Sequence, residues 1–423
     1  MPSDVHRIYE IRCPVYGFIK LNDLEWQIIS HPAFQRLRRI RQLAWTDYVF
    51  PGAMHTRFEH SLGVMNMASM LFDGIVERSF EILRSELGYK ETGLDRHKAL
   101  VRVTALLHDI GHSPFSHAGE ELFPFRDKKK GERYKHEHYS AEIIRRHFAP
   151  TIESHPLNSS NWDFSANDVA NLLEGRPEAG NALFWRGLIS GQLDADRMDY
   201  LLRDSLHAGV GYGRYDWQRL ANTTVAIPAS PERGSPRIGV MEGGWHAAEG
   251  LIIARYFMFT QVYFHKTRVV YDHHLQHALA DLLPGGCFPE PKGQEIDKYI
   301  EWDDWRVLGF LGEHKGGEHA ERLASRNHYR EITHTSEAPT QDEIKQLKKW
   351  RTALGKLLVC EIPAAASWYK TGPVDILVMS STPKPEPRPL SQYSSVVATI
   401  PPAAQVRLYA KDAKDRTAAI ARL

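Results

Sequence analysis

Histidine and aspartate side chains meet at the end of one strongly apolar segment, and this combination could bind a metal ion. The run VTALLHDIGH carries His108 and Asp109 where a buried helix is expected to end. A lone buried histidine is more often a satisfied core residue than a ligand. Here Gly111, His112 and the turn SPFSH follow at once, so polar groups accumulate at the end of the helix. A hydrolytic metal site needs a few histidine and carboxylate ligands, with positions left for water and substrate.

Two further segments carry residues of the same kinds. His60 lies in HTRFEHSLGV, in the first turns of an expected helix, and Asp196 lies in LDADRMDYLLRDSL. Asp196, Tyr200 and Asp204 recur every four residues and therefore share one face of a helix. Apolar residues such as Met198 provide the buried part of that helix. The acidic face is therefore expected to border the core rather than open solvent.

The elements that must position these residues are mostly helices, because apolar residues recur at helical spacing through much of the first two thirds of the chain. The expected helical segments are 22–45, 57–88, 95–109, 138–148, 166–174, 181–189, 194–207 and 245–283. Thr56 and Asp95 are the expected N-caps of the second and third segments, and Gly111 and Pro114 stop the third. We therefore predict an all-α bundle for this part.

Two regions depart from the helical pattern. Residues 222–243 (NTTVAIPASPERGSPRIGVMEG) are predicted to form a β-hairpin with a turn rich in proline and glycine. After Pro284 the segment PGGCFPEPKG is typical of a linker, and helices are expected to continue to about Leu358. The runs VDILVMSS and VRLYAK are predicted strands. The last third is therefore expected to be a smaller α+β lobe.

Composition limits the class of protein. Lys and Arg number 53 and Asp and Glu 52, so no global basic field is available to hold nucleic acid, although a local basic groove stays open. The three cysteines form no C-x-x-C pair, which favours a reducing compartment. Apolar stretches of about 18 or more residues are absent from the sequence. We therefore expect a cytoplasmic protein without a membrane partner.

The sequence segments that flank these histidines and aspartates show a more specific resemblance. His60, then His108–Asp109, then Asp196 match the H…HD…D signature of the HD-domain superfamily. The segments HPAFQRLRRIRQLAWTDYVFPGAMHTRFEHSLGV, ALLHDIGHSPFSHAGE and DADRMDYLLRDS together resemble the deoxynucleoside triphosphate triphosphohydrolases. The most similar branch includes the eukaryotic enzyme with a sterile alpha motif and an HD domain, and its bacterial relatives. The resemblance spans roughly residues 8–280.

The resemblance implies a fold and a division of the chain. We expect a mainly α protein, an HD-domain helical bundle with a small β-hairpin insertion and a C-terminal α+β lobe. Residues 1–283 would form the HD phosphohydrolase domain, with its core at about 50–210, and residues 284–423 the lobe. The implied activity is metal-dependent attack of water at the α-phosphorus of a deoxynucleoside triphosphate (dNTP). The products would be deoxynucleoside and inorganic triphosphate.

The resemblance also assigns roles to residues. His60, His108, Asp109 and Asp196 would bind a divalent ion, either Mg, Mn, Fe, Ni or Zn. His117 would donate a proton to the leaving 5′-oxygen, with Glu120 as its partner carboxylate, and His112 and His136 would lie near the phosphates. The expected substrate-binding residues are Gln42, Leu43, Arg57, Arg197, Tyr200, Asp204, Arg255, Tyr263, His265 and Lys266. Among these, Asp204 and Gln42 would bond the 3′-hydroxyl and Tyr263 would exclude a 2′-hydroxyl.

Regulation transfers from the family less completely. The eukaryotic relative is activated by guanine nucleotides at subunit interfaces, and Gln35 and Arg38 are retained from that site. Ser30 replaces the acidic residue expected to recognise guanine, so we predict that guanine-specific activation is absent. A homo-oligomer (dimer, tetramer or hexamer) is expected, with the 22–45 region as an interface. A different nucleotide activator at that interface stays open.

Two alternative functions remain at this point. One is another HD phosphohydrolase reaction, on a nucleoside monophosphate, a signalling nucleotide or a nucleic acid phosphodiester. The other is a non-catalytic scaffold that senses nucleotides. The sugar-pocket residues favour a deoxynucleotide over the first alternative. The intact ligand positions and His117 weigh against the second.

Overall fold

The long helix α3 (Arg57–Leu87) is the central element of the computed structural model, which describes residues 7–231, 234–364, 369 and 372–423. Thr56 caps it, and the backbone N–H of Thr56 lies 3.4 Å from Oε1 of Glu59, as a capping box requires. Gly88, at a φ of 71°, ends it. Its apolar face packs on α4 (Glu91–Leu107) and α8 (Ala195–Ala208). These three helices carry the expected metal ligands or end beside them.

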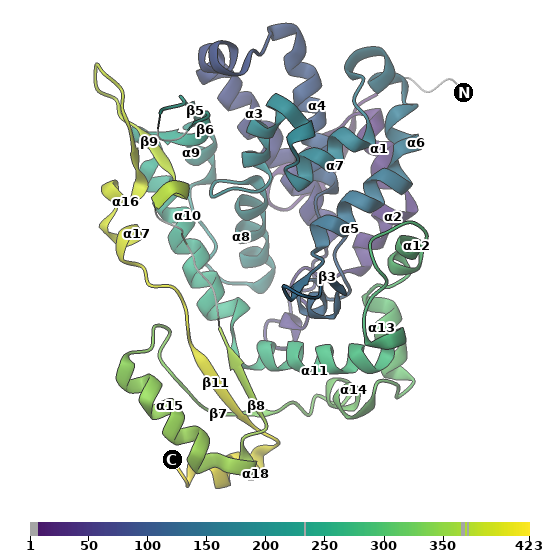
Figure 1. Cartoon of the computed structure of the whole chain (residues 1–423), viewed down its shortest axis with the longest axis vertical. Coiled ribbons are helices and arrows are strands. Elements are labelled where there is room, and N and C mark those ends of the chain that lie inside the picture. Colours follow the sequence, from purple (N-terminus) through teal and green to yellow (C-terminus); the bar gives the residue numbers. More distant parts are fainter. Residues whose placement is uncertain (1–6, 232–233, 365–368, 370–371) are drawn as a thin grey trace.

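The other helices surround this group and extend it toward the C-terminal end of the chain (Figure 1). Before α8 they are α1 (Asp23–Ser30), α2 (Pro32–Gln35), α5 (His136–Ile143), α6 (Ala149–Glu153) and α7 (Ala166–Glu174). After it they are α9 (Trp217–Ala221), α10 (Trp245–Met258), α11 (Lys266–Leu282), α12 (Glu295–Ile300), α13 (Asp304–Gly312), α14 (Gly317–Ala324), α15 (Gln341–Leu354), α16 (Leu390–Tyr393), α17 (Ser395–Thr399) and α18 (Ala413–Ile420). The prediction of a mainly α protein with small β elements is confirmed.

Several helix boundaries differ from the sequence-based ones. The segment 22–45 is not one helix, because Pro32, which lacks an N–H, begins a new helix after an extended His31. α4 begins at Glu91 rather than after Asp95. The segment 181–189 is not an α-helix, because it belongs to 3₁₀ turns over Pro177–Leu188 that end at the cap residue Ile189. These segments are short and depend on packing more than on local pattern.

The segment 245–283 is also divided. After α10 the chain makes a π-turn over Phe259–Tyr263, and α11 begins at Lys266. His265, in an extended conformation, caps α11, and its Nδ1 accepts a bond of 3.3 Å from the N–H of Thr267. The apolar run continues through the break, so periodicity alone predicts a single helix. The break turns the chain, so that α10 and α11 run in different directions (Figure 1).

The strands form small sheets of two to four strands. The strands are β1 (Tyr9–Cys13), β2 (Gly17–Leu21), β3 (Phe125–Asp127), β4 (Glu132–Arg133), β5 (Thr224–Ile227), β6 (Arg237–Met241), β7 (Arg330–His334), β8 (Cys360–Pro363), β9 (Leu377–Met379), β10 (Pro387–Pro389) and β11 (Val406–Ala410). The pairs β1–β2 and β3–β4 stand alone, while the larger sheets have the orders β10-β9-β6-β5 and β7-β11-β8. The predicted hairpin β5–β6 forms, with Thr224 opposite Val240.

The C-terminal third returns to the helical part of the molecule. β9, from the run VDILVMSS, pairs in parallel with β6 and so joins the hairpin sheet rather than the sheet of VRLYAK. Phe288, Tyr299 and Trp302 pack in the same hydrophobic core as α3 and α4. The sheet β7-β11-β8 lies with α15 and α18 at one end of the molecule (Figure 1). The domain boundary at 283/284 stays a prediction.

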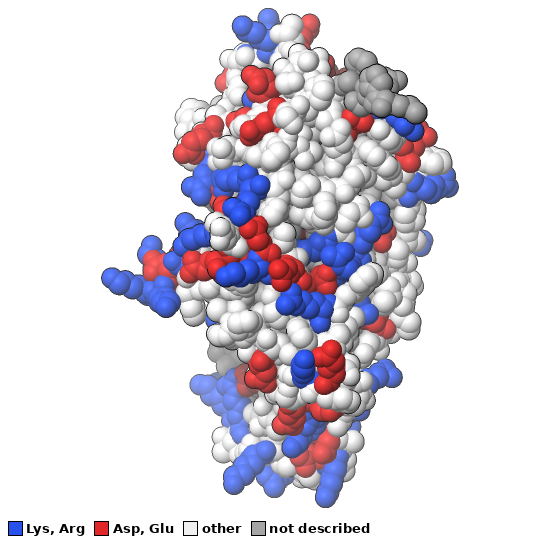
Figure 2. Space-filling view, turned by 90° about the vertical axis from the view of Figure 1, so that its right-hand side faces the viewer, with Lys and Arg blue, Asp and Glu red and all other residues white. Residues whose placement is uncertain are grey.

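The surface carries no single sign of charge on the face shown in Figure 2. Lys and Arg side chains are interspersed there with Asp and Glu side chains, in keeping with a formal net charge of +1. Within the described residues, every helix is too short or too polar to cross a membrane.

Candidate active site

Four predicted metal ligands converge where α3, α4 and α8 meet. Nε2 of His60 lies 3.0 Å from Oδ1 of Asp196 and 3.4 Å from Oδ2 of Asp109. Nε2 of His108 lies 3.2 Å from Oδ1 of Asp109 and 3.7 Å from Oδ1 of Asp196. His60, His108 and Asp109 are buried, and one ligand atom of each lies within 4.8 Å of the others. The four side chains thus surround one point.

Hydrogen bonds behind the two histidines fix which ring nitrogen faces that point. Nδ1 of His60 donates to Oδ2 of Asp199 over 2.8 Å, and Nδ1 of His108 donates to the carbonyl of Ala105 over 2.8 Å. In its neutral form each ring therefore keeps the lone pair of Nε2 for a ligand. Nε2 of His108 is buried and makes no aligned hydrogen bond within the described chain. Two such lone pairs facing two carboxylates fit a divalent cation.

Asp199 is a functional residue that the sequence reasoning missed. It is buried and bonds both His60 and Arg203, whose Nε and Nη2 each donate to it over 2.8 Å. Its position three residues after Asp196, and four before Arg203, is the signal that was available in the sequence. Asp199 therefore orients His60 and is itself held by a buried arginine.

The electrostatics of the ligands follow from this packing. Burial disfavours the charged form of His60, but the bonds to Asp196 and Asp199 outweigh it and raise its pKa to about 10. Burial likewise opposes ionisation of Asp109, and the Arg57 guanidinium holds the pKa of that carboxyl well below its usual range. Arg57 bonds Oδ2 of Asp109 through Nη1 and Oγ of Ser116 through Nε, the latter over 2.8 Å. Excess negative charge at the ligands is therefore balanced by neighbouring cationic groups.

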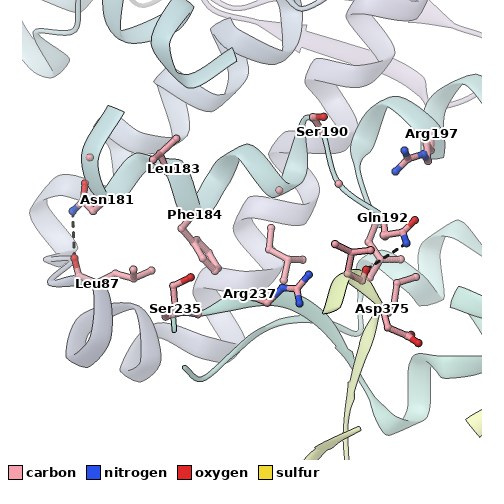
Figure 3. Close-up of a pocket in the computed structure, with 18 of the residues that line it drawn as sticks. Leu87, Asn181, Leu183, Phe184, Ser190, Gln192, Arg197, Ser235, Arg237 and Asp375 are labelled. Carbon is pink, nitrogen blue, oxygen red and sulfur yellow. Dashed lines mark hydrogen bonds between the residues drawn. The ribbon is translucent and has the colours of Figure 1, made fainter. Parts of the chain in front are cut away.

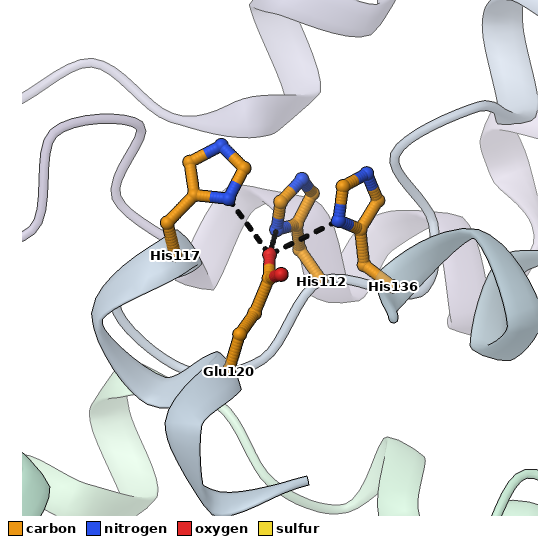
Figure 4. A group of neighbouring side chains, drawn as sticks. All are labelled: His112, His117, Glu120 and His136. Atoms are coloured by element: carbon orange, nitrogen blue, oxygen red, sulfur yellow. Dashed lines mark hydrogen bonds and ion pairs between the residues drawn. The ribbon is translucent and has the colours of Figure 1, made fainter. Parts of the chain in front are cut away.

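A second cluster lies beside the first and contains the predicted catalytic residues (Figure 4). Oε1 of Glu120 lies 2.8 Å from Nδ1 of His117, 3.0 Å from Nδ1 of His136 and 3.1 Å from Nδ1 of His112. The second nitrogen of each ring points away from Glu120 (Figure 4). Nε2 of His112 lies 3.2 Å from Oδ1 of Asp109, which links the two clusters.

The three imidazoles do not have equivalent environments. Burial lowers the pKa of His136, but Glu120 outweighs it and raises the pKa to about 9. Burial, then Arg57 and His136, lowers the pKa of His112 to about 4. The side chain of His117 is 67% exposed, so it is the member of the cluster most open to a bound molecule. One cluster therefore holds a cationic ring, a neutral ring and an accessible ring around one carboxylate.

A cavity of about 400 Å³ opens in front of both clusters. The predicted residues that line it are Gln42, Leu43, Arg57, His108, Asp109, His112, His117, His136, Asp196, Tyr200, Asp204 and Tyr263. His60 is fully buried behind it, and Glu120 lies beneath the histidine rings that line it. Twelve predicted residues that are widely separated in the sequence thus line one cavity.

At one end of this cavity, Asp204 is held by two neighbours. Its Oδ1 lies 2.7 Å from Nε2 of His55, and its Oδ2 accepts a bond of 2.6 Å from the hydroxyl of Tyr263. Nearby, Oε1 of Gln42 is buried and has no hydrogen-bond partner among the described residues. Leaving such an acceptor unpaired costs roughly 1–3 kcal/mol, so it is a place where a bound donor would be stabilised. His55 begins the HTRFEHSLGV segment, but the sequence reasoning assigned it no role.

The remaining predicted substrate residues lie elsewhere. Arg197 and Arg255 line an adjoining cavity of about 780 Å³, which shares Ser190 with the first (Figure 3). His265 caps α11, and Lys266 is exposed at its first turn; neither is among the residues that line the 400 Å³ cavity. Arg186 and Arg268, which the sequence reasoning did not select, line that cavity instead.

The residues of the expected regulatory interface lie in a separate groove. Ser30, Gln35 and Arg38 line a hollow of about 590 Å³ together with residues of β1 and the first turn of α3. The Arg38 guanidinium lies 3.5 Å from the ring centre of Phe58, and its Nε donates to Oε1 of Gln35 over 2.8 Å. This groove shares no lining residue with the cavity that Gln42 lines.

Comparison with known families defines the class of protein. The HD domain model matches residues 57–204, which contain all four candidate ligands. The HD associated region model matches residues 234–361. The chain therefore contains an HD domain at residues 57–204, followed by an HD associated region at residues 234–361.

Relatives and solved structures agree with this assignment. An uncharacterized protein of Methanocaldococcus jannaschii is 33% identical over 301 residues, covering 71% of this chain and 54% of that protein. The deoxynucleoside triphosphate triphosphohydrolase SAMHD1 of Gallus gallus is 32% identical over 253 residues, covering 55% of this chain and 38% of that protein. The chain thus spans about half the length, or less, of these relatives. The crystal structure of a hypothetical protein from Aquifex aeolicus matches with a TM-score of 0.78 at 28% identity, over 98% of this chain and 100% of that one.

Proposed function

We propose that the protein is a metal-dependent phosphohydrolase that cleaves dNTPs into deoxynucleoside and inorganic triphosphate. The observation that carries this proposal is the joint lining of one cavity by metal ligands, by the histidines around Glu120, and by Asp204, Gln42 and Tyr263. The relative from Gallus gallus, named as a dNTP triphosphohydrolase, adds support.

The ligand group accounts for the hydrolytic part of the proposal. A divalent ion bound by His60, His108, Asp109 and Asp196 would supply Lewis-acid activation of water and of a phosphate oxygen. Mg, Mn, Fe, Ni and Zn all remain candidates, because the same set of nitrogen and oxygen donors suits each of them. Arg57, fixed between Asp109 and Ser116, adds positive charge at the edge of the cavity where a phosphate would lie.

Protonation of the leaving group falls to His117 in this proposal. Its Nδ1 is held by Glu120, and its other nitrogen faces away from that carboxylate. A carboxylate on one ring nitrogen stabilises the imidazolium, so the opposite N–H can be given to the departing 5′-oxygen. His136 holds a second positive charge beside the same carboxylate, suited to the phosphates.

The sugar end of the cavity supports a deoxyribose. Oε1 of Gln42 and the Asp204 carboxylate are acceptors for a 3′-hydroxyl. Tyr263 is tied to Asp204 through its hydroxyl over 2.6 Å, so its ring cannot move aside without breaking a buried bond. A rigid ring in contact with the sugar edge would leave no space for a 2′-hydroxyl. The same restraint argues against ribonucleotides as good substrates.

The assay that tests the proposal offers the purified protein each dNTP and NTP with each of several divalent ions. Triphosphate released from dNTPs, and little or nothing from NTPs, is the expected result. Orthophosphate, pyrophosphate or no product would reject it, with another HD reaction or a nucleotide-sensing scaffold as the remaining explanations. Two variants separate chemistry from metal binding: His117→Ala should abolish turnover with the metal retained, whereas Asp196→Ala should lose the metal.

A further inference from the structure

Asp304, at the start of α13, joins two backbone segments that border the candidate active site. Asp304 is buried, with only 1% of its surface exposed. Oδ1 accepts a bond of 2.7 Å from the N–H of Phe115, and Oδ2 accepts one of 2.8 Å from the N–H of Arg41. Hydrogen bonds to an ionised acceptor are stronger than those between neutral groups. One buried carboxylate thus ties together two loops that are more than seventy residues apart in the sequence.

Each of these loops leads directly into the cavity. Arg41 precedes Gln42, and Phe115 lies two residues before His117. The loops also contact one another, because Oγ of Ser116 donates to the carbonyl of Arg41 over 2.6 Å. The distance between the expected sugar acceptor and the expected proton donor therefore depends on how these two loops are held.

The loop before His117 has a strained backbone. Phe115 and Ser116 have φ values of 56° and 59°, in the left-handed region that residues with a Cβ rarely adopt. Ala44, three residues after Arg41, has a φ of 48°. Such conformations persist when surrounding contacts impose them, and they concentrate at functional sites. The bond from Phe115 N–H to Asp304 acts directly on the strained residue.

We propose that Asp304 is a positioning residue for the hydrolytic reaction: it holds His117 at the correct separation from Gln42. The HD-associated region (234–361), to which Asp304 belongs, would then contribute to catalysis as well as to packing. The proposal rests on the proposed function for its substrate, but its geometric part concerns only the loops.

The neighbouring residue provides a matched control. Asp303 caps α13 through a 2.9 Å bond from the N–H of Arg306 and pairs with Arg39. Asp303 thus ties α13 to the same part of the molecule, yet bonds neither Phe115 nor Arg41 through its side chain in the described structure. Asp303→Asn removes a charge beside Asp304 and keeps a side chain that is suited to capping. Burial raises the pKa of Asp304 to about 7. Asp304 therefore differs from an exposed carboxyl in its ionisation as well as in its contacts.

The experiment compares Asp304→Asn with Asp303→Asn for dNTP hydrolysis, metal content and thermal midpoint. In Asp304→Asn an amide NH₂ faces a backbone N–H, so one loop is released. We expect kcat to fall on the order of 100-fold, as for small misplacements of catalytic groups, with a smaller change in KM and with the metal retained. Asp303→Asn should keep kcat near that of the wild type. Asp304→Ser, which retains one short acceptor, is measured in parallel in case Asp304→Asn does not fold.

A double variant distinguishes positioning from general stabilisation. If Asp304 acts through His117, adding Asp304→Asn to His117→Asn should change the residual rate by less than about twofold. A full, additive loss in the double variant would overturn the proposal, as would wild-type kcat in Asp304→Asn.

Amide hydrogen exchange separates a failure of this inference from a failure of the proposed function. If the wild type cleaves no dNTP, the proposed function fails, and the exchange of the Phe115 and Arg41 amides decides the geometric part. Faster exchange of at least one of the two amides in Asp304→Asn than in Asp303→Asn supports the inference. Equal exchange in the two variants overturns it.

Discussion

The candidate metal ligand His60 is oriented by Asp199, a residue that does not line the cavity. The sequence identifies His60, His108, Asp109 and Asp196 because their motifs are distinctive. It does not identify Asp199, because a charged residue on an amphipathic helix is usually solvated, and its burial depends on how α8 packs on α3. His55, Arg186 and Arg268 were not selected either, because only the tertiary packing brings them to the candidate site. Residue types can thus be predicted from motifs, whereas the groups that orient them require the packing.

The orienting role of Asp199 makes a prediction at this scale. Asp199→Asn should lower the affinity for the divalent ion by roughly 10- to 100-fold, because the His60 ring loses the carboxylate that fixes its tautomer. Isothermal titration with Mn²⁺ or Ni²⁺ measures the change. Asp297→Asn, at a partly exposed position on α12 where it pairs with Arg146, serves as the control. An affinity in Asp199→Asn equal to that of the control would refute this role.

Close approach of α3 and α8 fixes the geometry at the scale of elements. A Cβ added to Gly63 would collide with the Asp199 carboxylate and the Arg203 guanidinium. This contact could not be predicted from the sequence, because a glycine inside a helical pattern indicates only a residue of low helix propensity. Helices with strong caps, such as α3 and α8, could be predicted closely. The divided segments 22–45 and 245–283 could not, because their apolar periodicity continues through the breaks.

Gly63→Ala should therefore destabilise the protein by about 1–3 kcal/mol and weaken metal binding, because the buried pair must move. Gly93, in α4, has open space around an added Cβ. Gly93→Ala should instead be neutral or stabilise by up to about 1 kcal/mol. Denaturant unfolding of both variants checks this. Equal stabilities would mean that the α3–α8 contact tolerates the extra methyl group.

One buried histidine, His274, and one half-buried histidine, His273, make the packing of α11 on α14 sensitive to acid. Burial lowers the pKa of His273 to about 4, with smaller contributions from His277 and His319. Burial also lowers the pKa of His274 to about 2, with a smaller contribution from His319. In the unfolded chain both would titrate near 6.5. Because the folded pKa values are depressed, the stabilisation is fully present above about pH 6.5 and is lost as the pH falls toward 4.

His274→Gln should reduce the loss of stability at low pH, independently of its effect on stability at neutral pH. The thermal midpoint measured between pH 7.5 and about 4.5 would show a shallower slope than in the wild type. His246→Gln, at an exposed position on α10, should leave the slope unchanged. Parallel slopes in His274→Gln and the wild type would mean that other groups cause the acid sensitivity.

At the scale of the whole molecule, most of the candidate site and interface residues line two adjoining cavities and one groove. The 400 Å³ cavity contains the candidate chemistry, and the adjoining 780 Å³ cavity carries Arg197 and Arg255. The 590 Å³ groove at Ser30, Gln35 and Arg38 lies apart from both. The mainly α fold could be predicted from helical periodicity. The return of β9 to the hairpin sheet could not, because pairing between distant short strands leaves no local pattern.

Regulation is tested at this scale. Ser30 offers no carboxylate for the base of a guanine nucleotide, so GTP or dGTP should leave the hydrolysis of other dNTPs within about twofold of the basal rate. Initial rates with and without each nucleotide check this. An increase of orders of magnitude would show that another residue of the groove, such as Glu59, takes over that recognition.

The path of the attacking oxygen tests the central claim most directly. When a dNTP is hydrolysed in oxygen-labelled water, the labelled oxygen enters one of the two products. Mass spectrometry of both products then identifies which bond breaks. Attack at the α-phosphorus with departure of the 5′-oxygen predicts labelled triphosphate and unlabelled deoxynucleoside. Labelled deoxynucleoside, or deoxynucleoside monophosphate with pyrophosphate, would contradict the reaction proposed for this site.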